Sequence, residues 1–309
     1  MSLVTRVRPR ARTRQPEGDR TIISDADRRR PAVRVGLGAT QVVILVGLVI
    51  TGLGPLLWLL KSSVSTTQDI LREPFAIFPS GVVQLENFAI AWDKARIGQF
   101  LGNTAVIALG TTVTTLFVCL TAAYLLSVLR PRWGPALNVA IMATLFIPGV
   151  IALVPLYLTV LDLPILNISL INNYLAIWLP AGANAFLILV VKRFFDAIPR
   201  ELFEAARIDG AGAVRVFVLV VLPLSRPIIG VVALLTVMAS WKDFLWPLLV
   251  IPNPTLQPIS VALSKIADTT PLNVQIAALF LALIVPVGLF LIFQKQFLAG
   301  VGMAGGTKG

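Results

Sequence analysis

The chain alternates between long apolar runs and short polar segments. Five runs contain no Asp, Glu, Lys or Arg: Val35–Leu60, Ile97–Leu129, Trp133–Leu161, Leu163–Val191 and Thr269–Gln294. A sixth run, from Ile228 to about Val250, is interrupted only by Lys242 and Asp243. Each run exceeds the ~20 residues that a helix needs to cross ~30 Å of hydrocarbon. We therefore predict an all-α membrane protein with six transmembrane helices, at residues 37–60, 102–129, 135–159, 171–192, 227–250 and 272–295.

The Lys and Arg residues outside these spans are distributed unequally. If both termini are cytoplasmic, the inner segments carry twenty of them and the outer segments carry five. Segments rich in Lys and Arg stay on the cytoplasmic side of a membrane. The pattern therefore predicts an N-in, C-in topology.

Three segments follow from this topology. Residues 1–34 hold ten Arg, four acidic residues and three Pro, which predicts a disordered cytoplasmic tail. Residues 35–300 are the predicted six-helix transmembrane domain, and residues 194–224 are its longest internal cytoplasmic loop. Residues 301–309 are a Gly-rich cytoplasmic tail.

Composition narrows the possible chemistry. The chain is 57% hydrophobic and 13% charged, too few charges to cover a soluble domain of this size. It has no His, so His-based catalysis and His metal ligands are excluded. The single Cys119 can form neither an intrachain disulfide nor a metal site. No P-loop sequence occurs. We expect no enzyme activity, metal or cofactor in this chain, and no nucleic-acid partner, because its basic residues flank apolar spans.

The 194–224 loop has the pattern of a short helix, a turn and a return to the membrane. Pro199 suits the first turn of a helix, and Glu201 favours its positive end. Gly210 can adopt the left-handed conformation that ends a helix. Residues 214–221 then return to the membrane, and Pro223 is expected to stop that segment.

One face of this predicted helix is thin and apolar. Leu202, Ala205 and Ala206 share it, at spacing i, i+3, i+4. Another protein could approach the backbone closely at the two Ala residues, while Arg207 and Asp209 remain available for salt bridges. Amphipathicity alone equally fits a helix that lies on the membrane surface without a partner.

The full spacing resembles the EAA loop of ABC importer permeases. Glu204-Ala205-Ala206 is followed after three residues by Gly210, and after nine more by Val220, one residue and Leu222-Pro223. Val220 departs from the commoner Ile. In that family the loop is where a membrane subunit binds its separate ATPase. The resemblance implies an ATPase-coupling role for Glu204, Ala205, Ala206, Arg207, Asp209, Gly210, Leu222 and Pro223.

Other segments resemble carbohydrate importers in particular. They are Pro79 with Leu85-Glu86-Asn87 and Ala91-Trp92, then Asn103, then the stretch from Trp241 to Pro247 with Lys242 in place of a usual Asn, and finally Phe293-Gln294 with the Gly-rich terminus. Over about residues 40–309 the chain is similar to MalG-like permeases of the sugar-importing ABC family.

That resemblance implies a type I, MetI-like architecture in a bacterial or archaeal cell membrane. It also implies a second, MalF-like permease, two cytoplasmic ATPase subunits that bind ATP and Mg²⁺, and an extracytoplasmic sugar-binding protein. The chain would form half of an alternating-access pathway for a mono- or oligosaccharide.

Polar and aromatic residues near the span ends are candidates for that pathway. Aromatic rings can stack on the CH faces of a sugar, and polar groups can bond its hydroxyls. Helix packing and an aromatic belt at the membrane interface explain the same residues about equally well. The candidates are Asn103, Asn173, Trp241, Asp243, Phe244 and Trp246.

Two alternatives remain open at this point. An ABC permease for another solute, such as glycerol phosphate, a peptide or an amino acid, would have the same coupling loop. An ion-coupled secondary transporter would need internal repeats and a carboxylate near the midplane. The chain shows no convincing repeat, and Asp243 is the only acid available for that role.

Overall fold

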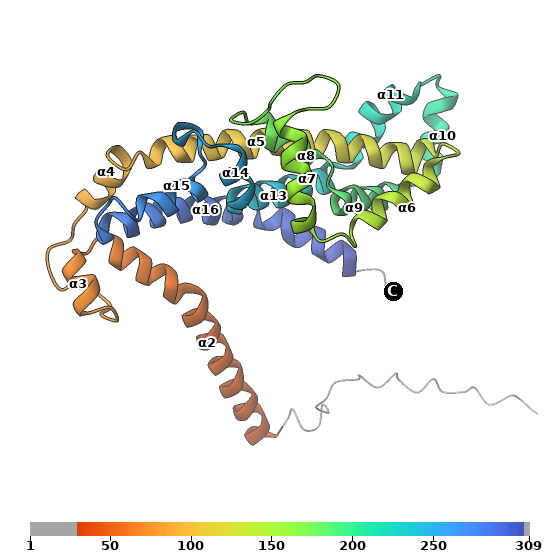
Figure 1. The fold of residues 1–309 in the computed structure, drawn as a ribbon. Helices are drawn as coiled ribbons and strands as arrows, with labels where there is room; N and C mark the ends of the chain where they lie inside the picture. The colour runs from red at the N-terminus through yellow and green to blue at the C-terminus, as the bar shows by residue number, and fades with distance from the viewer. Residues whose placement is uncertain (1–29, 306–309) are drawn as a thin grey trace, which may run out of the picture. The chain divides into compact units, whose positions relative to one another are not determined.

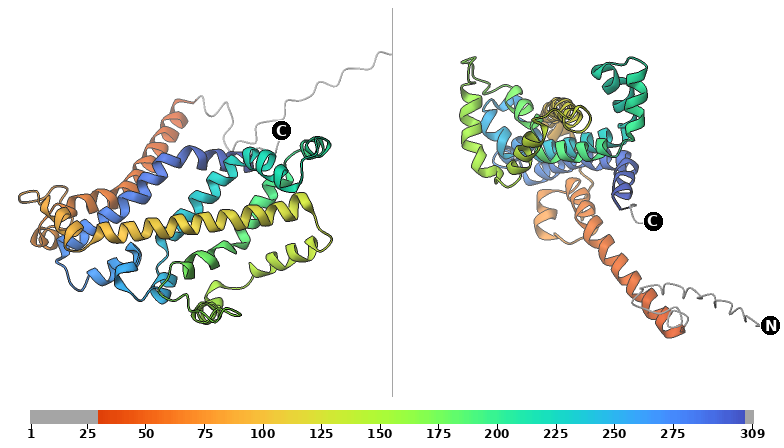
Figure 2. Two further views of the ribbon diagram at one scale, coloured as in Figure 1. Left: turned by 90° about the horizontal axis from the view of Figure 1, so that it is seen from above. Right: turned by 90° about the vertical axis from the view of Figure 1, so that its right-hand side faces the viewer.

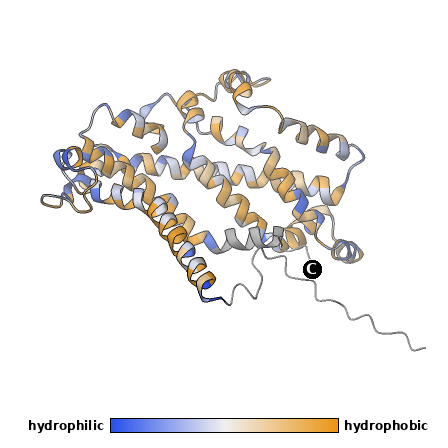
Figure 3. Cartoon of the chain, turned by 90° about the horizontal axis from the view of Figure 1, so that it is seen from below, coloured by the Kyte–Doolittle hydropathy of each residue, from blue (hydrophilic) through white to orange (hydrophobic). Residues whose placement is uncertain are grey.

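The computed structural model describes residues 30–305, with side chains described as far as Gln294. The chain divides into two units, one up to Leu57 and one from Trp58 onward. Helix α2 (Pro31–Ser63) is continuous through Pro55. Figure 3 shows that it is hydrophobic along most of its length. It begins inside the segment assigned to the tail, and the rest of that tail prediction, residues 1–29, lies outside the described residues.

Two further predicted spans are also continuous. Helix α5 (Ile97–Tyr124) continues through the π-helical turn η1 (Leu125–Leu129), and α16 covers Leu272–Gly305. Together with α2 they are the three described helices that are long and apolar enough to cross a membrane alone. Three bent helix pairs bring the total to as many as six spans, which agrees with the predicted number.

The third and fourth predicted spans are broken, which corrects the prediction of continuous helices. Helices α6 (Gly134–Thr144) and α7 (Gly149–Leu161) meet at 108°. Pro148 disfavours helical geometry at the residue before it, so α6 does not continue into α7 and ends at Thr144. Helices α8 (Leu175–Gly182) and α9 (Ala185–Asp196) meet at 46°. Between them, the Asn184 side chain accepts a hydrogen bond from the Leu187 N–H at 3.0 Å and caps α9.

The fifth predicted span, 227–250, is also wrong as one helix. Helix α13 covers Arg226–Lys242, and α14 (Leu245–Val250) begins after an extended Asp243. Pro247 explains this break, since a proline ring clashes with the carbonyl four residues earlier, which here belongs to Asp243.

The segment before α13 is helical as well. It consists of α11 (Ala213–Val216), the π-helical turn η2 (Phe217–Val221) and α12 (Leu222–Leu224), and it meets α13 at 78°. Pro223 therefore does not stop this segment, because it lies within α12, where Pro is tolerated in the first turn. The bend comes at Ser225, where Pro227 cannot continue the preceding helix.

Short elements connect these spans. They are α3 (Thr67–Arg72) and α4 (Glu86–Asp93) before α5, α10 (Arg200–Ile208) after α9, and the 3₁₀ turn η3 (Pro254–Leu256) with α15 (Ile259–Ile266) before α16. In Figure 1, α3, α4 and α15 lie at one end of α5, and α10 and α11 lie at the other.

Helix α5 is the centre of the second unit and packs against α8, α9 and α13 (Figure 2). It approaches α8 closely at Gly110, where a Cβ atom would overlap the Trp178 indole ring. The indole Nε1 donates a hydrogen bond to the Ile107 carbonyl at 3.1 Å. A residue without a side chain is therefore required at Gly110.

Candidate coupling loop and translocation cavity

Helix α10 has the boundaries expected of a short docking helix. Pro199 is extended and lies directly before the first turn, so α10 begins one residue later than the sequence suggests. Asp209 is the C-terminal cap, and Gly210 has a φ of +76°. Gly210 thus has the left-handed conformation that the sequence predicts, and a residue with a Cβ would be strained there.

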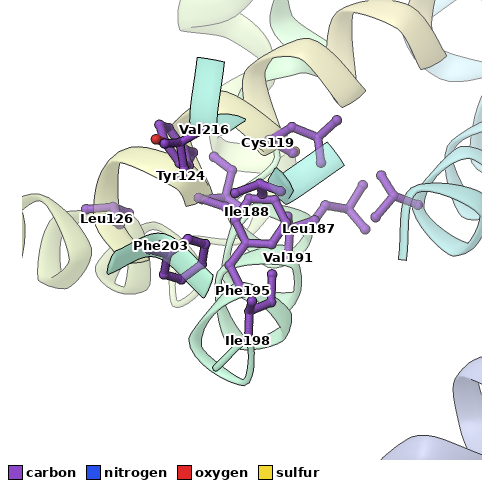
Figure 4. Close-up of a cluster of buried hydrophobic side chains, with 14 residues drawn as sticks. Cys119, Tyr124, Leu126, Leu187, Ile188, Val191, Phe195, Ile198, Phe203 and Val216 are labelled. Atoms are coloured by element: carbon purple, nitrogen blue, oxygen red, sulfur yellow. The ribbon is translucent and has the colours of Figure 1, made fainter. Parts of the chain in front are cut away.

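The buried face of α10 fixes it to the transmembrane helices. Phe203 is 8% exposed and belongs to a hydrophobic cluster with residues of α5 and α9. Figure 4 shows its ring among these side chains. Ala206, one turn further on, packs against the same cluster. This corrects the prediction that Ala206 shares a free face with Leu202 and Ala205, because a helical spacing of three places it beside Phe203.

The exposed side of α10 carries three apolar residues together with Glu201. Leu202 is 42% exposed, Ile208 is 86% exposed, and Ala205 between them is also exposed. An aliphatic surface of this kind on a short helix, away from the rest of the unit, is typical of a protein contact. The face that could meet a partner is therefore Leu202, Ala205 and Ile208.

The segment after α10 is held by Tyr124, near the end of α5. Its hydroxyl donates a hydrogen bond to the Ala213 carbonyl at 2.8 Å, and its ring lies 4.9 Å from that of Phe217. Leu222 is partly buried against the same hydrophobic cluster, and Pro223 is exposed. These last two predicted coupling residues therefore lie in the return segment and are not part of α10.

A polar network around Asp196 fixes the point where the chain leaves the membrane. Its carboxylate accepts hydrogen bonds from the Ser127 hydroxyl at 2.7 Å and the Lys192 ammonium at 2.8 Å. Arg130 lies 3.6 Å from the same carboxylate and donates to the Ser127 carbonyl. The end of α9 is thereby joined to the end of α5. The spacing of Lys192 and Asp196, four residues apart, was the sequence signal for this network.

A small cavity of about 110 Å³ separates this network from α10. Glu204 and Arg207 line it, as do Asp196 and Arg200. Neither Glu204 nor Arg207 forms an ion pair with any described side chain, that is, with residues 30–294. Both side chains are exposed and remain available to another protein.

A second cavity of about 830 Å³ lies deeper among the spans. Its walls come from α5, α7, α8, α9 and α13 and from the break before α14. Most of its lining is apolar, with a limited set of polar groups. These are Thr111, Thr115, Asn184, Thr236, Ser240, Lys242 and Asp243.

Two of the predicted pathway residues, Asp243 and Trp246, line this cavity. The Trp246 Nε1 donates to the Ala176 carbonyl at 3.0 Å, so its ring has a fixed position. The Asp243 carboxylate accepts a backbone hydrogen bond from Trp246. The backbone carbonyl of Asp243 accepts a hydrogen bond from the Ser260 hydroxyl at 2.7 Å, which joins the helix break to α15.

The other four predicted pathway residues lie outside the cavity lining. The Asn103 amide donates to the Thr255 and Gln257 carbonyls at 2.8 and 3.0 Å and so holds the loop before α15. Asn173 accepts from the Leu175 N–H at the start of α8. Trp241 is buried in a cluster with residues of α4, α5, α15 and α16. Phe244 is exposed but does not line the cavity.

Sequence reasoning missed the hydroxyl groups of the cavity. Thr111 and Ser240 line it, and neither hydroxyl has a hydrogen-bond partner among the described residues although both side chains are buried. Neighbouring Thr112, by contrast, donates to the Ala108 carbonyl of its own helix at 2.7 Å. The available signal was a polar stripe at spacing four on each helix, Thr111 with Thr115 and Thr236 with Ser240.

Comparison with known proteins agrees with this architecture. The family described as "Binding-protein-dependent transport system inner membrane component" matches residues 119–301. The chain is 28% identical to the sn-glycerol-3-phosphate transport system permease protein UgpE of Agrobacterium fabrum, over 88% of this chain and 97% of that protein. It is 29% identical to the diacetylchitobiose uptake system permease protein NgcG of Streptomyces coelicolor, over 80% and 82% of the two chains.

A solved structure shows the same fold. A chain from the crystal structure of a bacterial ABC transporter involved in the import of the acidic polysaccharide alginate has a TM-score of 0.76 and 22% identity. The alignment covers 86% of this chain and 98% of that chain. The helical architecture, the apolar spans and the family match lead to one conclusion: this chain belongs to the binding-protein-dependent transport system inner membrane components and is a multi-pass membrane permease.

Proposed function

We propose that this permease forms half of the translocation pathway of an ATP-driven importer for a sugar delivered by an extracytoplasmic binding protein. A second permease supplies the other half. Two separate ATPase subunits bind ATP and Mg²⁺ and hydrolyse the nucleotide, and both termini of this chain are cytoplasmic. The observation that carries the proposal is α10, a helix fixed on one face by Phe203 and free on the other.

Helix α10 is suited to transmit movement from an ATPase. Its free face, Leu202, Ala205 and Ile208, would be seated in a groove of that subunit. Its buried face packs directly on α5 and α9, so a displacement of α10 must shift those helices or break the packing. Packed interfaces move between discrete arrangements, which suits alternating access. Glu204 and Arg207, which form no ion pair with the side chains of residues 30–294, would pair with groups on the ATPase.

The 830 Å³ cavity is our proposed part of the substrate pathway. A buried hydroxyl without a partner costs about 1–3 kcal/mol. The Thr111 and Ser240 oxygens are buried in the cavity wall, so a sugar hydroxyl would remove that cost where substrate entry uncovers them, and the Trp246 ring offers an aromatic face. Within the described residues, Asn103, Asn173 and Trp241 have structural contacts, and we no longer propose them as pathway residues.

The cavity assignment is tested with Thr111→Val and Ser240→Ala in the reconstituted importer. Uptake of diacetylchitobiose, or of the sugar found to be transported, should fall while the subunits still co-purify. Thr112→Val is the matched control, because that hydroxyl is buried in the same helix but bonds its own backbone and does not line the cavity. Equal uptake by the Thr111, Ser240 and Thr112 variants would remove the cavity from the pathway.

One observation favours a second candidate substrate class, an anionic solute. Lys242 lines the cavity and is exposed, and it forms no ion pair with the described side chains of residues 30–294. A glycerol phosphate could bind this ammonium group, and one relative is named for transport of that solute. Uptake of sn-glycerol-3-phosphate that is lost in Lys242→Asn, with no uptake of neutral disaccharides, would favour this candidate. Uptake of a neutral sugar that is unchanged by Lys242→Asn would exclude it.

A further inference from the structure

The loop between α2 and α4 exposes large apolar side chains. Phe75 is 93% exposed, Ile77 is 82% exposed and Phe78 is 77% exposed. All three lie within four consecutive residues, between the charged Glu73 and the polar Ser80. Scattered exposed apolar residues are common, but a compact group of this size marks a contact with another apolar phase.

Two hydrogen bonds fix this loop beside the last turns of α2. The Trp58 Nε1 donates to the Pro74 carbonyl at 2.7 Å, and the Lys61 ammonium donates to the Glu73 carbonyl at 3.2 Å. Trp58 and Lys61 are three residues apart, about 4.5 Å along a helix. The chain just before Phe75 therefore lies at the level of Trp58 and Lys61, not beyond the end of the helix.

The far side of the loop is fixed to the same place. The Gln84 N–H donates to the Val64 carbonyl at 2.8 Å, and the Asn87 amide donates to the Ser63 and Ser65 carbonyls at 3.0 Å each. Asn273, at the start of α16, donates to the Asn87 side chain at 2.7 Å. Residues 75–83 are thus held between two bonded ends beside the end of a spanning helix.

That level is a membrane–water boundary. The uncharged run of α2 ends at Leu60, and Lys61 follows it directly. Trp and Lys are common where a span ends at the membrane–water interface, because the indole N–H and the ammonium group can reach polar groups there. The side chains of Phe75, Ile77 and Phe78 are therefore at the level of the headgroups and the upper part of the acyl chains.

The backbone of the loop indicates the same depth. Between residues 75 and 83, one backbone N–H, that of Ala76, bonds a backbone carbonyl, that of Glu73. The other N–H groups in this stretch need water, which the hydrocarbon core does not supply. A loop with a hydrated backbone and apolar side chains fits the interface and neither bulk water nor the bilayer centre.

We propose that Phe75, Ile77 and Phe78 form a lipid anchor that inserts into the outer leaflet of the membrane. The anchor holds the connection between α2 and α4 at the bilayer surface. The occupant of this apolar surface is lipid, and the bonds from Trp58 and Lys61 set the depth of insertion.

A nitroxide label measures that depth in the complete transporter, reconstituted in phospholipid nanodiscs. The label is attached at Ile77→Cys in a Cys119→Ala background, and its collision rates with oxygen and with a water-soluble nickel chelate are compared. Asp93→Cys is the water reference, because Asp93 is exposed at the end of α4. Val46→Cys is the lipid reference, because Val46 is exposed in the middle of the first apolar run.

The measured quantity is the ratio of the oxygen collision rate to the nickel collision rate. We expect this ratio to be several-fold higher for the Ile77 label than for the Asp93 label, and lower for the Ile77 label than for the Val46 label. Trp58→Phe removes the bond to Pro74 and should shift the Ile77 label toward the value of Asp93. An Ile77 value equal to that of Asp93 in the wild-type background would show that the loop lies in water. Protection from both reagents would show that a protein subunit covers the loop. Either result would overturn the proposal.

Discussion

Replacement of Phe203 by Ala should detach α10 without unfolding the spans. Phe203 is 92% buried, and it is the buried side chain of α10. Truncation of a buried Phe to Ala costs about 3–5 kcal/mol. At ~1.4 kcal/mol per factor of ten, this lowers the ratio of docked to undocked α10 by more than about a hundredfold. A helix of nine residues has little stability alone, so undocking would melt it.

Hydrogen exchange of residues 200–208 measures this change directly in the purified permease. Exchange in Phe203→Ala should approach the rate of an unstructured peptide, while α5 and α9 keep their protection. In the assembled importer, the number of sugars taken up per ATP hydrolysed should fall at least tenfold. Leu202→Ala is the control, because Leu202 lies on the free face and its loss should leave exchange in the isolated permease unchanged. Equal exchange in wild type and Phe203→Ala would refute the packing account of coupling.

Three other perturbations test separate parts of the structure. Gly110→Ala should lower the unfolding free energy by about 1–3 kcal/mol, because its Cβ would overlap the Trp178 ring. Gly102→Ala on the same helix is the control, because a Cβ there has nothing within 4 Å. Equal midpoints of thermal unfolding in detergent for the two variants would contradict the close α5–α8 contact. Asp196→Asn should destabilise the α5–α9 junction by on the order of 1 kcal/mol, since the Asp196 side chain is about one-third exposed. It should also raise the number of ATP molecules hydrolysed per sugar transported. An unchanged ratio of ATP hydrolysed to sugar transported would limit the network to a local role. Deletion of Ser2–Asp27 should leave sugar uptake unchanged at equal membrane levels, because the sequence of this tail lacks apolar periodicity. The deletion retains Arg28, Arg29, Arg30 and Arg34. Loss of uptake would reveal a function in the tail.

The apolar pattern predicted the number of spans but not their continuity. Length and hydropathy report what can cross a membrane, and α5 and α16 meet both criteria as single helices. The breaks at Pro148, Asn184 and Asp243 arise from local steric clashes and side-chain capping, which hydropathy does not measure. The prolines were visible in the sequence. Pro55 and Pro286 nevertheless lie inside continuous helices, so the presence of a proline does not by itself predict a helix break.

The coupling loop was more predictable than the cavity. Gly210 and the helix before it follow from local rules on caps and turns. Which face of α10 is buried depends on contacts with α5 and α9, so the inward position of Ala206 could not be read from α10 alone. In the same way, Trp241 and Trp246 are five residues apart in one motif and lie on either side of the break between α13 and α14. Trp241 packs in a hydrophobic cluster and Trp246 lines the cavity.

The most direct test of the account is whether the free face of α10 binds the ATPase. Ala205→Arg places a large charged side chain in the middle of that face and leaves Phe203 in position. The variant is purified through a tag on this chain from cells that express the whole importer. We predict that the second permease co-purifies at the wild-type level and that the ATPase subunits are lost. Recovery of the ATPase subunits at the wild-type level, with ATP-driven uptake unchanged, would contradict the central claim that this permease is coupled to its ATPase through α10.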